Sequence, residues 1–410
     1  MPDDYHQPPA QPRAASGSVA DSGGPDDAAG FQHGISGVPR VALRAIPAGV
    51  AGGVQTTHGA DPDRGALSGG GRGASGGGGA DGSALRPACG RGDHARPVFS
   101  LNVSPDGYAW WYVDGVSDDG TQAISIIGFI GSVFSPWYAW SGRRNPQNHC
   151  CLNVATYGPG SRFTMTDRGT SALRQTDDTL TIGPSRMHWN GQALVIDIDE
   201  IGAPPMVTPV RGRVVLTPQA ITGVEVALSP DNAHLWRPFA PIARIDVDLT
   251  QGHRWQGHGY FDANFGTRAL EADFDYWTWG RFPRRDGALC LYDATRRDGT
   301  KLAMGLHIDA QGHATQVTPP PLTRFARTNW ALRRETRADP GVTPHQVMAM
   351  LDAPFYSRSV VETQIDGEIS RGVHEALDLD RYKQPLLKPM LAVRVPRRRN
   401  WSFSTAGEDA

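Results

Sequence analysis

The sequence of 410 residues has little of several features that define protein classes. Its four cysteines, at 89, 150, 151 and 290, are too few and too scattered for a disulfide framework or a paired-cysteine zinc site. The 40 Lys and Arg residues nearly balance the 42 Asp and Glu residues, so the basic excess typical of nucleic-acid binders is missing. No apolar run approaches the roughly 20 residues that span a bilayer. These shortages argue against a disulfide-rich domain, a nucleic-acid partner and an integral membrane protein.

Aromatic residues are almost missing from the first hundred positions, which contain only Tyr5, Phe31 and Phe99. The same stretch contains 22 of the 49 glycines. Such a segment buries too little apolar surface to offset its backbone entropy. We therefore predict a disordered Gly/Ala-rich tail over residues 1–96. The acidic and proline-containing start also lacks the basic and apolar regions of a signal peptide.

The remainder, residues 97–398, is rich in short segments that alternate with period two, with turn residues every 8–12 positions. The segments at 98–103 and 107–116 predict strands that end at SPDG and SDDG, and a long apolar run at 122–134 is typical of a fully buried strand. Only 343–351 predicts a helix, with Thr343 as its N-cap. Many short strands with regular turns predict an all-β protein.

The strands fall into two successive sets, which predicts two tandem antiparallel β-barrel domains. The first set gives a domain over residues 97–222, and the second gives a domain over residues 223–398. Residues 399–410 are predicted to form a short C-terminal tail. A basic cluster at 394–400 is interpreted either as a solvated end or as a contact with an anionic membrane surface.

The segment HGYFDANFG (258–266) carries a candidate acid. On a strand, Tyr260, Asp262 and Asn264 share one face, opposite Phe261 and Phe265. A carboxyl group among aromatic rings has a raised pKa, as general-acid chemistry near neutral pH requires. The alternative interpretation is a surface or turn-capping aspartate.

Aromatic residues near this segment are candidates for an apolar pocket. His234 and Trp236 share one face if their segment is extended. Trp255, Trp277 and Trp279 fall in neighbouring predicted strands. Together the three tryptophans would line an apolar pocket, and their ring faces would stabilise a cation. The alternative for each of them is ordinary core packing.

Paired acids give a second candidate chemistry. A glycosidase needs two carboxyl groups at a defined separation, and the available acids are Asp197, Asp199, Glu200, Glu271 and Asp273. A solvated strand face explains the same residues.

No metal site is expected, because the pair His149–Cys150 has no second pair of ligands at suitable spacing. Phosphate-loop and nucleophile-elbow motifs are also missing, which favours chemistry without a cofactor.

Three long aromatic motifs resemble the acyclic carotenoid 1,2-hydratases, the hydroxyneurosporene synthases of purple bacteria. They are GYAWWYVDGVSDDG (107–120), GFIGSVFSPWYAW (128–140) and NPQNHCCLNVATYG (145–158). The segment 255–282 extends the resemblance, which covers residues 98–398. It implies lipocalin-like β-barrel domains and hydration of the terminal C1=C2 bond of acyclic carotenoids such as neurosporene and lycopene, with no cofactor.

The resemblance also implies the active residues. The family's His-x-Trp and Tyr-x-Asp pairs match His234 with Trp236, and Tyr260 with Asp262. Asp262 would protonate C2, Tyr260 would orient it, Trp236 would face the cation and His234 would hold the attacking water. Because the substrate lives in lipid, we expect peripheral association with the cytoplasmic side of the cytoplasmic or intracytoplasmic membrane. The rival hypothesis is a lipocalin-like carrier of polyenes or lipids without catalysis.

Overall fold

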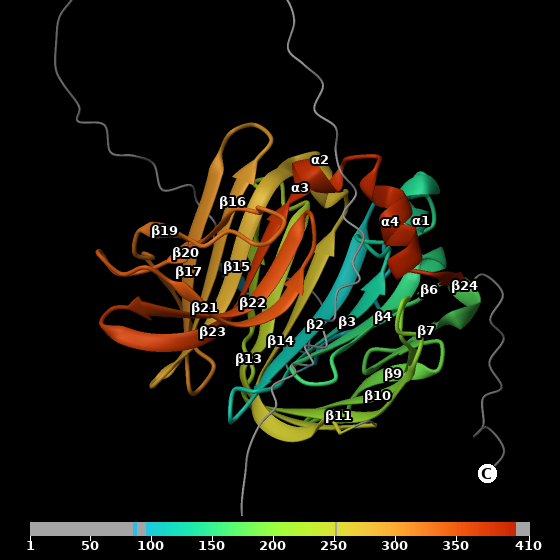
Figure 1. The fold of residues 1–410 in the computed structure, drawn as a ribbon, viewed down its shortest axis with the longest axis horizontal. Helices are drawn as coiled ribbons and strands as arrows, with labels where there is room; N and C mark the ends of the chain where they lie inside the picture. The colour runs from blue at the N-terminus through green and yellow to red at the C-terminus, as the bar shows by residue number, and fades with distance from the viewer. Residues whose placement is uncertain (1–84, 88–95, 251, 399–410) are drawn as a thin grey trace, which may run out of the picture. The chain divides into compact units, whose positions relative to one another are not determined.

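Antiparallel β-sheet dominates the described residues, which are 85–87, 96–250 and 252–398 of a computed structural model. Within these ranges, one sheet has fifteen strands, a second has seven and a third has two (Figure 1). All described residues belong to one compact unit, Gly76–Ala410. The structure confirms the all-β fold class that the sequence predicted.

The fifteen-stranded sheet, called the large sheet below, is antiparallel apart from the parallel pair β24–β6. Its main path runs β24 (Arg397–Arg398), β6 (Asp167–Arg168), β4 (Cys150–Tyr157), β3 (Ala123–Ile130), β2 (Tyr108–Ser117), β14 (Arg254–Gly266), β13 (His234–Leu249), β11 (Pro209–Ala220), β10 (Leu194–Ile201), β9 (Ser185–Trp189), β8 (Thr179–Ile182) and β7 (Leu173–Gln175). Three short strands pair beside this path: β1 (Leu85–Pro87), β12 (Val224–Ala227) and β5 (Arg162–Met165).

The seven-stranded sheet is called the second sheet. Its order is β18 (Ala314–Val317), β17 (Lys301–Asp309), β16 (Gly287–Arg296), β15 (Phe274–Arg284), β23 (Glu368–Asp378), β22 (Tyr356–Ile365) and β21 (His345–Asp352). The two-stranded sheet pairs β19 (Leu322–Phe325) with β20 (Arg334–Arg337). The described helices are α1 (Pro136–Trp140), α2 (Leu270–Asp273), α3 (Leu379–Tyr382) and α4 (Leu387–Arg394), with two 3-10 turns at Pro146–Asn148 and Thr170–Ala172.

The central strands of the large sheet are buried on both faces. One face of β2 carries Trp111 and Val113 into a core that the curled large sheet closes with residues of β8 to β11. The other face carries Tyr112 into a second core, which includes Trp279 and Tyr292 of the second sheet. Every residue of β3 is buried, in agreement with the fully buried strand that the run at 122–134 predicted.

Two predictions of local structure are wrong. Residues 343–351 were predicted as a helix, but residues 345–351 belong to β21, which pairs with β22 through two register shifts at the edge of the second sheet. Sheet pairing overrides the local helical pattern there. Residues 98–103 were predicted as a strand, but their backbone bonds instead to Asp177 O and to the side chain of Gln175.

The predicted division into domains stays a prediction. The strands β12, β13 and β14 follow residue 222 in the chain and pair within the large sheet, beside strands of the first predicted domain. The predicted tails at 1–96 and 399–410 lie outside the described residues, apart from Arg96 and from Leu85–Pro87, which forms β1.

Candidate functional site

A cavity lies between the large sheet and the second sheet, with Asp262 in its wall. About 310 Å³ inside it is free of atoms, including space open to solvent. We call it the Asp262 cavity. Its walls come from β2, β13 and β14 on one side and from β15, β16 and β23 on the other: Trp110, Tyr112, Trp236, Asp262, Asn264, Trp277, Trp279, Tyr292 and Glu375.

The period-two alternation of β14 places Asp262 there. Tyr260, Asp262 and Asn264 share the inner face, as predicted, while Phe261 belongs to the core on the other face. Trp236 on β13 lies directly opposite Asn264. A neighbour two residues from an opposite partner is within reach of an aromatic side chain, so the indole of Trp236 reaches Asp262.

Asp262 is hydrogen-bonded only to uncharged groups among the described residues. Its Oδ2 accepts from Trp236 Nε1 and from the Tyr260 hydroxyl, both at 2.8 Å, and its Oδ1 accepts from Asn264 Nδ2 at 3.1 Å. The residue is 4% exposed, and no described Lys or Arg forms an ion pair with it. The carboxyl group is therefore buried without a counter-charge.

Burial raises the pKa of Asp262 from 3.8 to about 8. Desolvation outweighs the hydrogen bonds from Trp236 and Tyr260, which favour the charged form. Near neutral pH the group is consequently a carboxylic acid. Because Oδ2 already accepts two hydrogen bonds, we place the acidic hydrogen on Oδ1.

Asp114, on the neighbouring strand β2, is a buried acid that differs from Asp262 in having a charged partner. It is also fully buried, and burial also raises its pKa. Arg281 Nε donates to Asp114 Oδ1 at 2.8 Å, and a second guanidinium nitrogen pairs with the same oxygen. Asp114 therefore has the counter-charge that Asp262 lacks, and it joins β2 to β15 across the two sheets.

Aromatic rings form most of the cavity wall. The ring of Tyr292 lies 5.8 Å from that of Trp236 and 6.0 Å from that of Trp277, between ring centroids. Trp279 lies 5.7 Å from Tyr112 in an edge-to-face arrangement. Ring faces arranged in this way stabilise a positive charge that forms among them.

Glu375 also lines the cavity, although it was not among the site residues predicted from the sequence. Arg358 Nε donates to its Oε1 at 2.7 Å. A signal was present in the sequence, because Glu375 lies between Val373 and Leu377 on the same face of a strand, and both are buried. An acid flanked by apolar residues at two positions on either side is expected to point inward.

His234 is buried but is not among the cavity residues. Its Nε2 lies 2.6 Å from Asp273 Oδ2, and its Nδ1 lies 2.8 Å from the Tyr108 hydroxyl. Since the carboxylate only accepts, Nε2 donates and Nδ1 accepts from Tyr108. Burial lowers the pKa of His234 despite the bond to Asp273, which keeps the ring neutral. Its position gives no support to the expected contact with the attacking water.

The three predicted substrate-binding tryptophans separate into two places. Trp277 and Trp279 line the Asp262 cavity. Trp255 lies on β14 opposite Val247 and packs against the core inside the curled large sheet. The position of Trp255 therefore does not support a contact with the same ligand.

The acids that suggested glycoside hydrolysis are engaged elsewhere. Asp197 and Asp199 pair with arginines on an exposed strand face, and Glu200 is buried against Arg168. Glu271 pairs with Arg143. Ion pairing, rather than a shared catalytic cleft, explains these residues. In the described part of the chain, no three His, Cys, Asp or Glu side chains form a group that would hold a metal ion.

Comparison with known proteins matches residues 126–404 to the family described as carotenoid hydratase CrtC. An acyclic carotenoid 1,2-hydratase of Cereibacter sphaeroides is 70% identical over 279 residues, which are 68% of this chain and 100% of that protein. One of Thiocapsa roseopersicina is 44% identical over 377 residues, or 90% of this chain and 93% of that protein. The solved structure of kievitone hydratase from Nectria haematococca has a TM-score of 0.42 and 10% identity, covering 72% of this chain and 98% of that chain.

Proposed function

The chain belongs to the carotenoid hydratase family, and on that premise we propose that it adds water across the terminal C1=C2 bond of acyclic carotenoids such as neurosporene and lycopene. The observation that carries this proposal is the buried Asp262, hydrogen-bonded to uncharged groups in the wall of an aromatic cavity, where burial raises its pKa to about 8. The roles of the individual residues below are part of the same proposal.

Asp262 is the proposed proton donor. An isolated trisubstituted alkene is a weak base, so hydration begins with a positioned acid that delivers a proton to C2. The proton on Asp262 Oδ1 is transferred to C2. The π electron pair of the C1=C2 bond forms the new C2–H bond, and a tertiary cation remains at C1. Trp236 and Tyr260 stabilise the resulting carboxylate through their bonds to Oδ2. General-acid catalysis of this kind contributes on the order of 10²–10⁴-fold in rate.

Glu375 and the aromatic rings are proposed to stabilise the cation. Trp236 and Trp277 present ring surfaces to the cavity, and the Glu375 carboxylate supplies the charge of opposite sign. A water that donates a hydrogen bond to Glu375 attacks C1. Its surplus proton goes to the Asp262 carboxylate, which restores the acid. The net reaction is the addition of one water to one double bond.

No cofactor is proposed for this reaction, because neither the proton transfer nor the addition of water is an oxidation or a reduction.

His234 is proposed to act on the site from outside the cavity. Its bond to the Tyr108 hydroxyl fixes Tyr108, whose ring stacks on the cavity residue Trp110 at 4.8 Å. This position makes it a positioning residue.

We also propose peripheral association with the cytoplasmic or intracytoplasmic membrane, where the apolar substrate resides. Helix α4 supports this idea, because Met390 is 51% exposed and Val393 58% exposed, and Leu386 just before the helix is 87% exposed. These three positions follow the spacing of one helix face. No helix among the described residues is long and apolar enough to cross a membrane.

Product analysis tests the catalytic proposal. Purified wild-type protein and Asp262→Asn are incubated with lycopene or neurosporene, and the extracted pigments are examined for the tertiary alcohol at C1. We expect the product from the wild type and none from the variant. Unchanged pigment recovered from a wild-type protein that binds it would favour the carrier hypothesis instead.

Vesicle flotation tests the membrane proposal. Wild-type protein should float with carotenoid-containing vesicles, and Val393→Glu should lose most of this binding. Ile369→Glu is the matched control, because Ile369 is 65% exposed but lies on β23, away from α4. A wild-type protein that remains entirely in the soluble fraction would contradict the proposal.

A further inference from the structure

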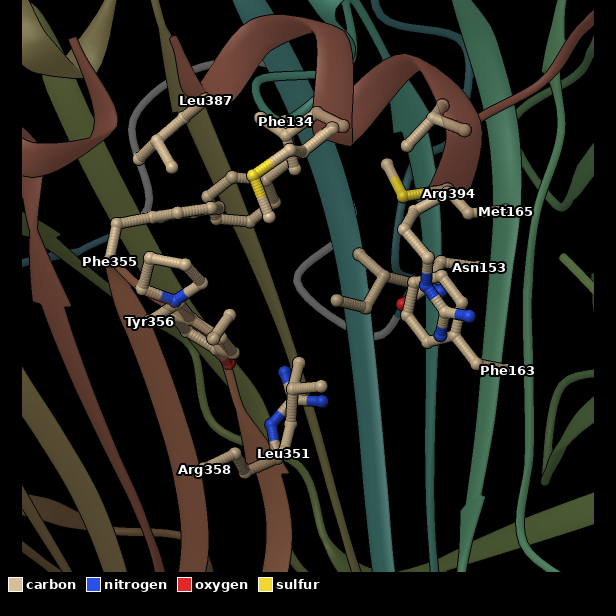
Figure 2. A pocket seen from close by; sticks show the side chains of 16 residues that line it. Phe134, Asn153, Phe163, Met165, Leu351, Phe355, Tyr356, Arg358, Leu387 and Arg394 are labelled. Atoms are coloured by element: carbon tan, nitrogen blue, oxygen red, sulfur yellow. The ribbon is translucent and has the colours of Figure 1, made fainter. Parts of the chain in front are cut away.

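A second, larger cavity lies beside the Asp262 cavity, and we call it the chamber. About 910 Å³ inside it, including its open mouth, is free of atoms. Figure 2 shows α4 above the chamber, with Leu387 and Arg394 at the top and Arg358 at the bottom. Its walls are mainly apolar and include Phe134, Phe163, Met165, Phe355, Leu387 and Leu391.

Sheet register places the two cavities next to each other between the two sheets. Across the large sheet, Asp262, Tyr112, Ile127, Asn153 and Met165 are successive partners on β14, β2, β3, β4 and β5. The first two line the Asp262 cavity and the last three line the chamber.

The facing row of the second sheet has the same division. Tyr292, Trp279, Glu375, Arg358 and Leu351 are successive partners on β16, β15, β23, β22 and β21. The first three line the Asp262 cavity, and the last two line the chamber. Two opposed rows therefore lead from the proposed acid into the chamber.

Arg358 contacts two residues of the Asp262 cavity at the place where the two cavities adjoin. Arg358 faces the chamber, and its Nε donates to Glu375 of the Asp262 cavity at 2.7 Å. The same guanidinium lies 5.1 Å from the ring centroid of Tyr112, which also lines the Asp262 cavity. A lining residue of the chamber is therefore in direct contact with two lining residues of the Asp262 cavity.

The polar groups of the chamber are already engaged with the protein. Asn153 Nδ2 donates to Thr164 O at 2.6 Å, and one Arg394 nitrogen donates to Pro204 O at 2.5 Å. Arg358 bonds to Ser125 Oγ and Tyr157 in addition to Glu375. The inner surface that remains for a ligand is apolar, which suits hydrocarbon rather than a sugar, a nucleotide or a charged metabolite.

We infer that the chamber binds the unsaturated hydrocarbon chain of the substrate while its terminal double bond lies beside Asp262. This inference rests on the proposed hydration of an acyclic carotenoid. The smaller cavity accommodates an end group, and the rest of a long chain continues past the Arg358–Glu375 pair into the chamber. The mouth beneath α4 is where the chain enters, since Met390 both lines the chamber and is exposed.

Narrowing the chamber from α4 tests the inference. Leu391→Trp adds bulk at a lining position, and Ile369→Trp adds bulk at an exposed position of β23 that is not among the lining residues. Each variant is assayed in detergent with lycopene and with a ten-carbon acyclic terpene that has the same end group. Lycopene affinity is measured separately from turnover, through the shift of the polyene absorption band on binding.

We expect Leu391→Trp to weaken lycopene binding and to lower kcat/KM for lycopene by about tenfold or more. Turnover of the short terpene should stay within about twofold of wild type, which also shows that the variant is folded. Ile369→Trp should resemble wild type with both substrates. If Leu391→Trp does not fold, Leu387→Trp makes the same test one helical turn earlier.

Unchanged lycopene affinity in a folded Leu391→Trp variant would overturn the inference, and so would an equal loss with both substrates. Failure of the proposed function gives a different result. In that case the wild type hydrates neither substrate, while the effect of Leu391→Trp on lycopene binding still reports on the chamber.

Discussion

The indole N–H of Trp236 donates to Asp262 Oδ2 at 2.8 Å, although the two residues are 26 positions apart. The pairing of β13 with β14 makes this contact. It joins the His-x-Trp segment to the Tyr-x-Asp segment through a single oxygen atom. The hydroxyl of Tyr260 donates to the same oxygen, so both donors stabilise the charged form that remains after proton transfer.

The pH dependence of hydration should follow the ionisation of Asp262. The acid form is the active form, and burial raises its pKa to about 8. Activity should therefore be lost as pH rises through about 8, and it should not depend on this group at lower pH. The measurement is kcat/KM with neurosporene at a series of pH values. A decline centred near 4, where an exposed aspartate ionises, would contradict this assignment.

Removing the indole donor should move this pH profile. Trp236→Phe deletes one hydrogen bond to the carboxylate, so the pKa of Asp262 should rise further, by about one unit. The alkaline limb of the profile should shift upward by a similar amount, and the maximum rate should fall because the conjugate base is less stable. Trp255→Phe is the matched control, since Trp255 lies outside the cavity, and its profile should coincide with that of wild type.

Asp262 should also decrease the stability of the folded protein near neutral pH. Its folded-state pKa is above its unfolded value, so the folded state binds one more proton between about pH 4 and 8. The free energy of unfolding therefore falls as pH rises through that interval. Asp262→Asn removes this dependence, and it should be the more stable protein at pH 8 by a few kcal/mol.

Chemical denaturation at pH 4, 6 and 8 measures this effect. The difference between Asp262→Asn and wild type should grow with pH. A constant difference, or a variant that becomes relatively less stable as pH rises, would mean that Asp262 is ionised in the folded protein throughout this range.

Glu375 should matter for both rate and stability. Glu375→Gln removes the negative charge that faces the proposed cation, and turnover should fall by on the order of 10²-fold. The variant also leaves Arg358 without its carboxylate partner inside the protein, which costs about 3–5 kcal/mol. Steady-state kinetics and urea unfolding measure the two effects.

Glu362→Gln is the control for that experiment. Glu362 pairs with the exposed Arg371 at the surface and does not line the Asp262 cavity. Both activity and stability should remain close to wild type, because surface ion pairs contribute little. An unchanged rate in Glu375→Gln would exclude a role for this carboxylate near the cation.

Much of the fold could be predicted from local sequence patterns. Alternation in the segment around Asp262 correctly assigned which side chains share a face. The apolar run of β3 correctly indicated burial on both sides. These features depend on neighbours along one strand, so a single sequence contains the necessary information.

The predictions that failed depend on contacts between distant segments. The strand β21 forms because β22 offers it a partner, although its residues alone favour a helix. Arg397 was assigned to a solvated or membrane-facing basic end, but it pairs with the buried Asp167, 230 positions earlier. Glu375 was missed because only the packing of the two sheets brings it to Asp262.

The protonation state of Asp262 is the central claim, and infrared difference spectroscopy tests it most directly. The spectrum of Asp262→Asn is subtracted from that of wild-type protein at a series of pH values. We expect a carboxylic acid C=O band at pH 7 that belongs to Asp262 and disappears as pH rises through about 8. A carboxylate band at pH 7, with no acid band, would contradict it.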